Sequence, residues 1–339
     1  MENLYLLDCT LRDGANVVGN GFDAELTKLI IEGLIASNVK EIEFGNAKGL
    51  GAYQSAGAVA PLNDEEYMDL VQPYLSEGNL GMFVLANNLN EENVSLASKK
   101  SLNFLRVGTD AGDGESARAG IELIKKHKLK CRFSLMKAYL STAEELAEEA
   151  ALLESFGVDE ITIMDSAGTM TPEQVEAYVS KMVEKVNIPV GFHGHNNLGL
   201  SSANAIVAVE AGATSIDCGL MGMARSAGNC TTEMIAAIFQ RDGKLESVDL
   251  FNLLNFIDQQ LEPAMKNHNY HNAVSPLNLI YGLSGCHSSF EKRYKQIAEE
   301  KNVDLYRLII ETSKVDRKAP TESLMERIGE TLKSPNHLE

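Results

Sequence analysis

The sequence predicts a (β/α)8 (TIM) barrel followed by a helical C-terminal domain. Three observations support this fold class. Apolar strand-like runs alternate with helix-period segments eight times over about 240 residues, which is the expected size of such a barrel. Several helical segments begin with clear capping signals, and strand signals stop after about residue 240. The alternative, an open doubly wound sheet, lacks the GxGxxG motif after its first strand.

Each predicted strand is a short run rich in apolar residues that is bounded by polar or turn residues. In chain order the strands are expected at 4–8, 41–44, 80–84, 104–108, 130–136, 160–164, 189–193 and 215–217.

Three predicted helices carry start signals. Asp23 precedes a segment whose apolar residues have helical spacing, and Thr142 with Glu145 has the spacing of a capping box. Thr171 stands directly before Pro172, which places an N-cap in front of a proline at the first helical position.

Two domains are expected. The barrel, as the catalytic domain, is predicted to cover 1–245, and a helical domain is predicted to cover 246–339. Turns such as 275–276 and 318–320 separate the helical segments of the second domain, and the last residues are expected to fray.

Composition excludes several classes of partner. The formal charge is −18, whereas nucleic acids and anionic membranes reward clustered Lys and Arg. The first residues resemble no secretory signal, and no apolar run approaches the roughly 20 residues that span a bilayer. The five cysteines are scattered without CxxC spacing, which favours reduced thiols over a disulfide framework or a zinc–thiolate site. A soluble cytoplasmic protein is expected.

The pattern His193-Gly-His195 at the end of the seventh strand indicates a metal site. Residues i and i+2 of an extended strand point the same way, so both imidazoles can face one point. Asp13 follows the first strand and would complete a two-His, one-carboxylate face that leaves metal positions open for substrate. In a barrel these groups meet, because functional residues gather at the C-terminal ends of the strands. The alternative is two hydrogen-bonded polar residues in the barrel mouth.

Other candidates lie at the same strand ends. Arg12 is suited to hold a substrate carboxylate or an enolate oxygen, with a salt bridge to Asp8 or Glu43 as the alternative. Asn229 is either an additional oxygen ligand or part of a glycine-rich turn.

Lys137 follows the fifth strand. Its amine is suited to form a Schiff base, to bind an anionic substrate tail or to extend into solvent. Asp165 and Asp217 are candidates to support the histidines, and Arg106 to neutralise the acidic cluster.

Several motifs together resemble the superfamily of metal-dependent barrel lyases and synthases that includes HMG-CoA lyase. They are Asp8-Cys-Thr-Leu-Arg-Asp-Gly14 and Gly191-Phe-His-Gly-His-Asn-Asn-Leu-Gly199. Within that superfamily the chain is most similar to 4-hydroxy-2-oxovalerate aldolase. This likeness is carried by 42–50, Met164-Asp-Ser-Ala-Gly168, 203–213 and Gly222-Met-Ala-Arg-Ser-Ala-Gly-Asn229, and it covers nearly the whole chain.

The resemblance implies a divalent-metal-dependent aldolase, a carbon–carbon lyase that cleaves or forms a 4-hydroxy-2-oxo acid through a metal-bound pyruvate-type enolate. It implies Asp13, His193 and His195 as ligands, with Mn²⁺ or Mg²⁺ preferred over Zn²⁺, and Arg12 as the residue that stabilises the enolate. The expected partners are a 2-oxo acid and an aldehyde, with an acylating aldehyde dehydrogenase and homo-oligomerisation as further expectations.

Two departures from the aldolase pattern concern proton transfer. The family has an acid–base histidine where this chain has Asn16, and a neutral amide hydrogen-bonds but does not act as a general base. A tyrosine of the family's C-terminal domain is replaced in the segment around His287. We hypothesise that His287 reaches the barrel mouth and supplies the missing group; the alternative is a surface or packing histidine.

Two other functions stay open at this point. One is a synthase that condenses an acyl-coenzyme A with a 2-oxo acid, although the chain lacks the Arg-Asp-Gly-Glu-Gln motif of that branch. The other is a non-catalytic partner subunit, against which the retained Arg12, Asp13, His193 and His195 argue.

Overall fold

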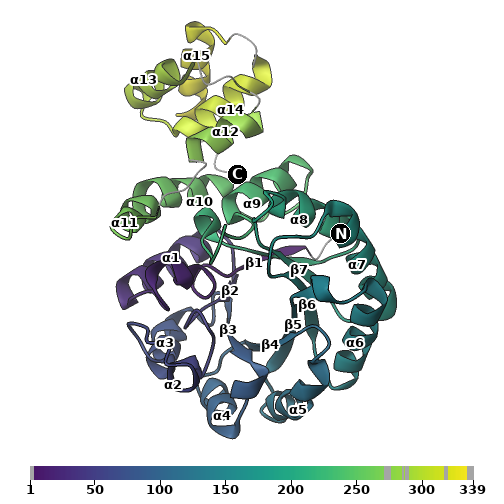
Figure 1. Cartoon of the computed structure of the whole chain (residues 1–339). Helices are drawn as coiled ribbons and strands as arrows, with labels where there is room; N and C mark the ends of the chain where they lie inside the picture. Colours follow the sequence, from purple (N-terminus) through teal and green to yellow (C-terminus); the bar gives the residue numbers. More distant parts are fainter. Residues whose placement is uncertain (1–3, 271–275, 285, 287–289, 317–319, 334–339) are drawn as a thin grey trace.

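The computed structural model describes residues 4–270, 276–284, 286, 290–316 and 320–333. Eight parallel strands close into a barrel in the order β1 to β8, and helices surround it (Figure 1). This confirms the predicted (β/α)8 barrel. The strands are β1 (Tyr5–Asp8), β2 (Glu41–Glu43), β3 (Asn79–Leu85), β4 (Phe104–Asp110), β5 (Lys130–Met136), β6 (Glu160–Asp165), β7 (Val190–Gly194) and β8 (Ser215–Cys218).

The barrel closes between β1 and β8, where Tyr5 is in register with Ser215 and Asp8 with Cys218. Because all strands run the same way, their C-terminal ends meet at one rim. The loops after β1, β2, β3, β7 and β8 therefore share that rim although they are far apart in sequence.

The helices around the barrel begin where the sequence predicts. Asp23 accepts a hydrogen bond from the backbone N–H of Leu26, and Thr142 and Thr171 each form a capping box. The barrel helices are α1 (Ala24–Ala36), α2 (Ala52–Ser55), α3 (Asp64–Val71), α4 (Glu91–Lys99), α5 (Arg118–Lys126), α6 (Ala143–Ser155), α7 (Pro172–Lys185), α8 (Ser201–Glu210) and α9 (Thr232–Arg241).

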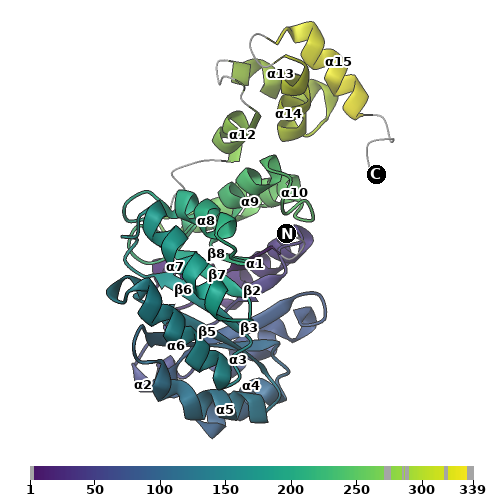
Figure 2. The same ribbon diagram turned by 90° about the vertical axis from the view of Figure 1, so that its right-hand side faces the viewer.

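Helices continue after the barrel. They are α10 (Leu250–Phe256), a π-helical turn at Ile257–Leu261, α11 (Glu262–Lys266), α12 (Pro276–Ser284), α13 (Glu291–Lys301), α14 (Leu305–Val315) and α15 (Glu322–Leu332). In both views α12 to α15 form a group outside the ring of barrel helices, beyond α9 and α10 (Figure 2). The predicted division at residue 245 stays a prediction.

Helix α10 packs closely on the barrel. A Cβ atom at Gly33 of α1 would lie 2.4 Å from the ring of Phe256, so a glycine is required for this approach. In the part of the chain that the structure describes, no helix is both long and apolar enough to cross a membrane.

The barrel interior contains two buried groups of charged and polar side chains. We call Arg12, Glu43, Arg106 and Asp217 the upper cluster, because it lies toward the C-terminal rim. The lower cluster comprises Tyr5, Glu41, Arg132 and Glu160, near the N-terminal ends of their strands.

A small apolar layer of Leu7, Cys9 and Phe104 separates the two clusters. Cys9 Sγ accepts a hydrogen bond from Arg106 of the upper cluster at 3.4 Å, and the guanidinium of Arg132 in the lower cluster lies 4.0 Å from the Phe104 ring centre. The main apolar core lies outside this layer, largely between strands and helices.

Candidate active site

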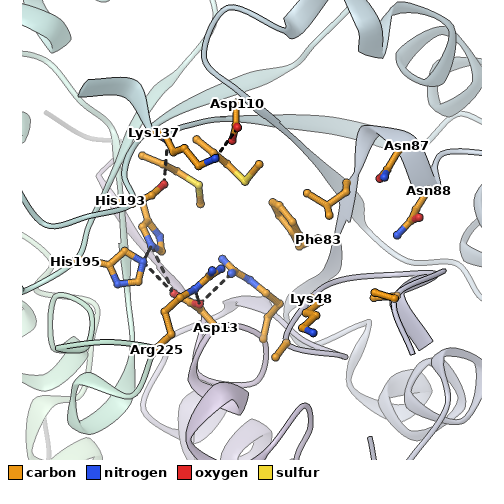
Figure 3. Close-up of a pocket in the computed structure, with 18 of the residues that line it drawn as sticks. Asp13, Lys48, Phe83, Asn87, Asn88, Asp110, Lys137, His193, His195 and Arg225 are labelled. Carbon is orange, nitrogen blue, oxygen red and sulfur yellow. Dashed lines mark hydrogen bonds and ion pairs between the residues drawn. The ribbon is translucent and has the colours of Figure 1, made fainter. Parts of the chain in front are cut away.

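Three side chains converge at the C-terminal rim of the barrel. Asp13 lies in the turn after β1, His193 is in β7, and His195 follows β7 in an isolated bridge with Asn229. The Nε2 atoms of the two histidines are 3.5 Å apart, and each lies 3.6 Å from Oδ2 of Asp13 (Figure 3). All three residues are buried. The structure therefore brings together the three residues that the sequence predicts as metal ligands.

The electrostatic environment keeps these groups in the forms that bind a metal. Burial, together with the charge of His193, lowers the pKa of His195 to about 4, so its imidazole is neutral near pH 7. Burial alone would raise the pKa of Asp13, but the adjacent Arg12 and the two histidines outweigh it and hold that pKa below its usual value. Asp13 is therefore a carboxylate.

Asp217 orients His193. Oδ2 of Asp217 lies 3.0 Å from Nδ1 of His193, as expected for a residue supporting a ligand. Burial would raise the pKa of Asp217, but the ion pair with Arg106 and the contact with His193 lower it to about 2. Because an ionised carboxylate can only accept, Nδ1 of His193 donates its proton to Asp217, and Nε2 faces Asp13 and His195.

Asp165, the other carboxylate predicted as support, does not have this role in the described contacts. Its oxygens accept hydrogen bonds from the backbone N–H groups of Thr169 and Met170 at 3.0 and 2.9 Å, so it stabilises the loop after β6.

Arg12 forms the salt bridge to Glu43 that the sequence left open as an alternative, and its substrate-binding role stays a prediction. Its Nε donates to Oε1 of Glu43 at 2.5 Å, and its Nη1 lies 3.3 Å from Oδ1 of Asp13. Nη2 is buried without a hydrogen-bond partner among the described residues, and Arg12 lines the cavity. The salt bridge fixes the guanidinium and leaves one donor for an anionic oxygen.

Two asparagines contact Asp13, the carboxylate among the candidate ligands. Asn229 donates from Nδ2 to Oδ2 of Asp13 at 2.9 Å, while its Oδ1 is buried without a partner in the described part of the molecule. Asn16 donates from Nδ2 to the backbone carbonyl of Asp13 at 2.8 Å. Asn229 is thus placed to offer an oxygen, and Asn16 holds the turn that carries Asp13.

Lys137 lies on the cavity wall with a left-handed backbone conformation, φ 53° and ψ 37°. Its Nζ is 2.6 Å from Oδ2 of Asp110, and this hydrogen bond raises the pKa of the amine. A Schiff-base lysine needs a lowered pKa, so this environment argues against that role. His287, the predicted proton-transfer residue, lies outside the described residues.

Sequence reasoning missed several cavity residues. The cavity of about 430 Å³ is also lined by residues from the loops after β2, β3 and β8 and from the end of β4: Lys48, Asn87, Asn88, Arg225 and Asp110. The available signals were their positions after predicted strands and, for Lys48 and Arg225, their places in the segments 42–50 and 222–229 that carry the family resemblance.

The residues present fit a divalent cation. The three ligand atoms form a triangle with sides of 3.5, 3.6 and 3.6 Å, whose centre is about 2.1 Å from each corner. That distance matches bonds from oxygen and nitrogen to small divalent ions. The unpartnered Oδ1 of Asn229 is a further donor beside Asp13. Two histidines, a carboxylate and an amide oxygen are a donor set for such a cation rather than for a soft one.

Comparisons with known proteins show the family of the chain. The HMGL-like family model matches residues 3–259. A 4-hydroxy-2-oxovalerate aldolase of Moorella thermoacetica is 34% identical over 310 residues, which is 91% of each chain. One from Carboxydothermus hydrogenoformans is 30% identical over 335 residues, or 99% of each chain.

Among solved structures, the HMG-CoA lyase of Bacillus subtilis has the same fold, with a TM-score of 0.66 at 16% identity. The match covers 83% of this chain and 99% of the lyase.

Proposed function

The chain belongs to the HMGL-like family, and we propose that it is a divalent-metal-dependent aldolase that cleaves or forms a 4-hydroxy-2-oxo acid. It is thus a carbon–carbon lyase. The observation that carries this proposal is the convergence of Asp13, His193 and His195 beside the unpartnered Nη2 of Arg12. The acyl-coenzyme A synthase and the non-catalytic subunit are not favoured by the relatives.

Asp13, His193 and His195 would hold the cation, with Asn229 as a further oxygen donor, and the oxygen-rich chemistry of a 2-oxo acid favours Mn²⁺ or Mg²⁺. When bound, the cation supplies a Lewis acid that polarises the keto group of the 2-oxo acid.

In the cleavage direction the 4-hydroxyl loses its proton and the C3–C4 bond breaks. The electron pair of that bond stays on the 2-oxo acid as an enolate, the aldehyde departs, and protonation at C3 gives pyruvate or a homologue. Arg12 is held by Glu43 and keeps Nη2 free, so it would stabilise the oxygen on which charge develops. Asp217 would keep the His193 imidazole in the form whose Nε2 binds the cation.

The proton-transfer group is the unproven part of this reaction. Asn16 bonds to Asp13 and has no basic nitrogen, so it would support the turn rather than move a proton. The role of His287 stays a prediction. If it transfers the proton, His287→Ala lowers kcat and removes a limb of the pH–rate profile; unchanged turnover across pH would exclude it.

The cell context is also part of the proposal. Cys9, Cys131, Cys218 and Cys230 are buried free thiols, which suits a reducing compartment such as the cytoplasm. An acylating aldehyde dehydrogenase as a partner stays an expectation from the resemblance.

The direct test is exchange of the C3 protons of pyruvate in D2O, measured by mass spectrometry. We expect exchange with Mn²⁺ or Mg²⁺, its loss with a chelator and its return when the cation is restored. Thiol release from acetyl-coenzyme A with a 2-oxo acid would instead indicate the synthase. Trapping of Lys137 by borohydride with pyruvate, insensitive to chelator, would indicate Schiff-base chemistry.

A further inference from the structure

The cavity beside the metal-ligand residues is positively charged. Its lining contains four cationic side chains, those of Arg12, Lys48, Lys137 and Arg225, and two carboxylates, those of Asp13 and Asp110. These six side chains carry a net charge of +2, whereas the whole chain has a net charge of −18. Basic side chains are therefore concentrated at this cavity although the chain as a whole is acidic.

Most of these cations already have a carboxylate partner. Lys137 is paired with Asp110 at 2.6 Å, and Arg12 is paired with Glu43. Arg225 places Nε 3.7 Å from Oδ1 of Asp13. Among the described residues no carboxylate lies within 4.0 Å of Nζ of Lys48, which is exposed to solvent and therefore open to an anionic ligand.

The loop after β2 is built to hold Lys48 at the cavity wall. The buried Asn46 accepts a hydrogen bond from the backbone N–H of Lys48 at 3.0 Å through Oδ1. Its Nδ2 donates to the carbonyl of Ala58 at 2.7 Å, and the N–H of Ala47 donates to the carbonyl of Asn20 at 2.8 Å. The backbone that carries Lys48 is thus fixed on both sides.

Lys48 lies across the cavity from the metal-ligand residues. Figure 3 shows His193 and His195 on one side of the cavity, and Phe83 with Lys48 below it on the other. All four residues line the same cavity. A bound molecule can therefore meet the candidate ligand atoms, an apolar ring and a cation within one cavity.

The cavity is also larger than the smallest substrate of this reaction type needs. At about 30 Å³ per non-hydrogen atom, the volume of one water in the liquid, a five-carbon 4-hydroxy-2-oxo acid takes roughly 270 Å³. The cavity measures about 430 Å³, which leaves room for an additional group of several atoms.

Resting on the proposed aldolase function, we propose that the aldehyde half of the substrate ends in an anionic group, a carboxylate or a phosphate, that is bound by Lys48. The carboxylate of the 2-oxo acid occupies the end near Asp13, His193 and His195, and a second anion on the aldehyde half would pair with the open cation of Lys48 in the same cavity.

The test compares aldehydes that differ in charge but little in length. Purified enzyme with Mn²⁺ and pyruvate is given 4-oxobutanoate or its neutral methyl ester, and glyceraldehyde 3-phosphate or glyceraldehyde, and kcat/KM for aldol addition is measured for each. We expect at least one anionic aldehyde to be preferred over its neutral counterpart by about 10-fold or more, the scale of one charge-assisted contact. The pair with the larger preference for the charged aldehyde shows whether the bound anionic group is a carboxylate or a phosphate.

Variants assign the preference to Lys48. Lys48→Gln is expected to reduce the ratio to less than about 3-fold and Lys48→Arg to retain most of it. The matched control Lys28→Gln removes an exposed lysine of α1, away from the cavity, and should leave the ratio unchanged.

Two outcomes overturn the inference: neutral aldehydes used as well as anionic ones, or a preference that survives in Lys48→Gln. Pyruvate C3 exchange without aldehyde is measured in parallel. If exchange occurs but no anionic aldehyde is preferred, this inference alone fails. If neither exchange nor addition to any aldehyde occurs, the aldolase function fails with it.

Discussion

The upper and lower clusters of the barrel share one arrangement, an arginine that bridges two carboxylates, but they differ in their relation to the cavity. In the upper cluster Arg106 bridges Glu43 and Asp217, and in the lower one Arg132 bridges Glu41 and Glu160. All four carboxylate oxygens of the lower cluster accept hydrogen bonds or ion pairs.

Unpartnered atoms occur in both clusters. One oxygen of Asp217 and Nη2 of Arg12 in the upper cluster, and Nη1 of Arg132 in the lower one, have no hydrogen-bond partner among the described residues. Of these three residues, Arg12 lines the cavity and the other two do not. The comparison teaches that neither a buried charge nor an unpartnered atom marks a candidate site by itself, whereas an unpartnered donor beside a cavity does.

The sharpest way to separate the clusters is to remove a metal ligand. His195→Gln takes one of three ligand atoms from the upper rim, so we expect kcat/KM to fall at least about 10³-fold and Mn²⁺ binding to be lost. Turnover and titration calorimetry with Mn²⁺ measure the two effects.

The control for this variant is His127→Gln, which changes a histidine paired with Glu91 on the surface and should leave both values unchanged. A His195→Gln enzyme that kept wild-type turnover would contradict the assigned site.

A substitution in the lower cluster should lower the stability of the fold rather than the catalytic rate. Glu160→Gln leaves Arg132 without one of its two buried carboxylates, and breaking a buried pair from one side costs about 3–4 kcal/mol of unfolding free energy. Urea unfolding of the metal-free protein measures this loss.

Mn²⁺ affinity should stay within about 2-fold of wild type, because Glu160 has no contact with the ligand residues. The control is Glu148→Gln, an exposed pair partner of Lys185 expected to cost less than about 1 kcal/mol. Equal losses in both variants would mean that the lower cluster does not stabilise the barrel.

Asp8 allows a test of the same comparison by pH. Like Asp217 it is buried at the C-terminal rim, but among the described residues no cationic side chain pairs with it. Burial raises the pKa of Asp8 to about 6 although Thr10 and Thr232 donate hydrogen bonds to it. Since the folded pKa lies above the unfolded value, the contribution of Asp8 to stability is complete below pH ~4 and is lost as pH rises through about 6.

Asp8→Asn should therefore become more stable relative to wild type by about 3 kcal/mol between pH 4 and pH 7.5. Unfolding free energies of both proteins across this range give the difference. A difference that does not change with pH would contradict the shift. Asp217, which has Arg106 beside it, is lowered to a pKa of about 2, so its contribution is lost in the opposite direction, as pH falls.

The smallest expected effect is a change in Mn²⁺ affinity when Asp217 of the upper cluster, which contacts His193, is substituted. Asp217→Asn removes the charge that orients Nδ1 of His193, so Mn²⁺ affinity should fall about 10- to 100-fold while the ligand atoms remain. Calorimetry measures the affinity, and circular dichroism verifies that the variant is folded. Wild-type affinity in the folded variant would show that Asp217 serves the fold alone.

Much of this comparison could be predicted from sequence, and the missing part has a physical reason. The eightfold alternation predicts the barrel, and the motifs around Asp13 and His193 predict the ligands because short-range spacing fixes where their side chains point. Asp217 was expected to support a histidine, and it does.

Lys48 was not singled out although it lies in segment 42–50, because that segment does not show which carboxylates fold near its amine. Arg12 binds Glu43 through Nε while its Nη2 has no partner among the described residues. This arrangement likewise depends on three-dimensional packing.

The contrast between a cationic cavity and an acidic chain also affects how substrate arrives. A 2-oxo acid approaching from beyond about 10 Å meets the repulsion of a net charge of −18, which dissolved salt screens over that distance. The attraction inside the cavity acts over a few ångströms and is screened much less. Moderate salt should thus raise the rate at which the anionic substrate reaches the protein. The cationic cavity then attracts the anion only at short range, after it has passed through the repulsive field of the acidic surface.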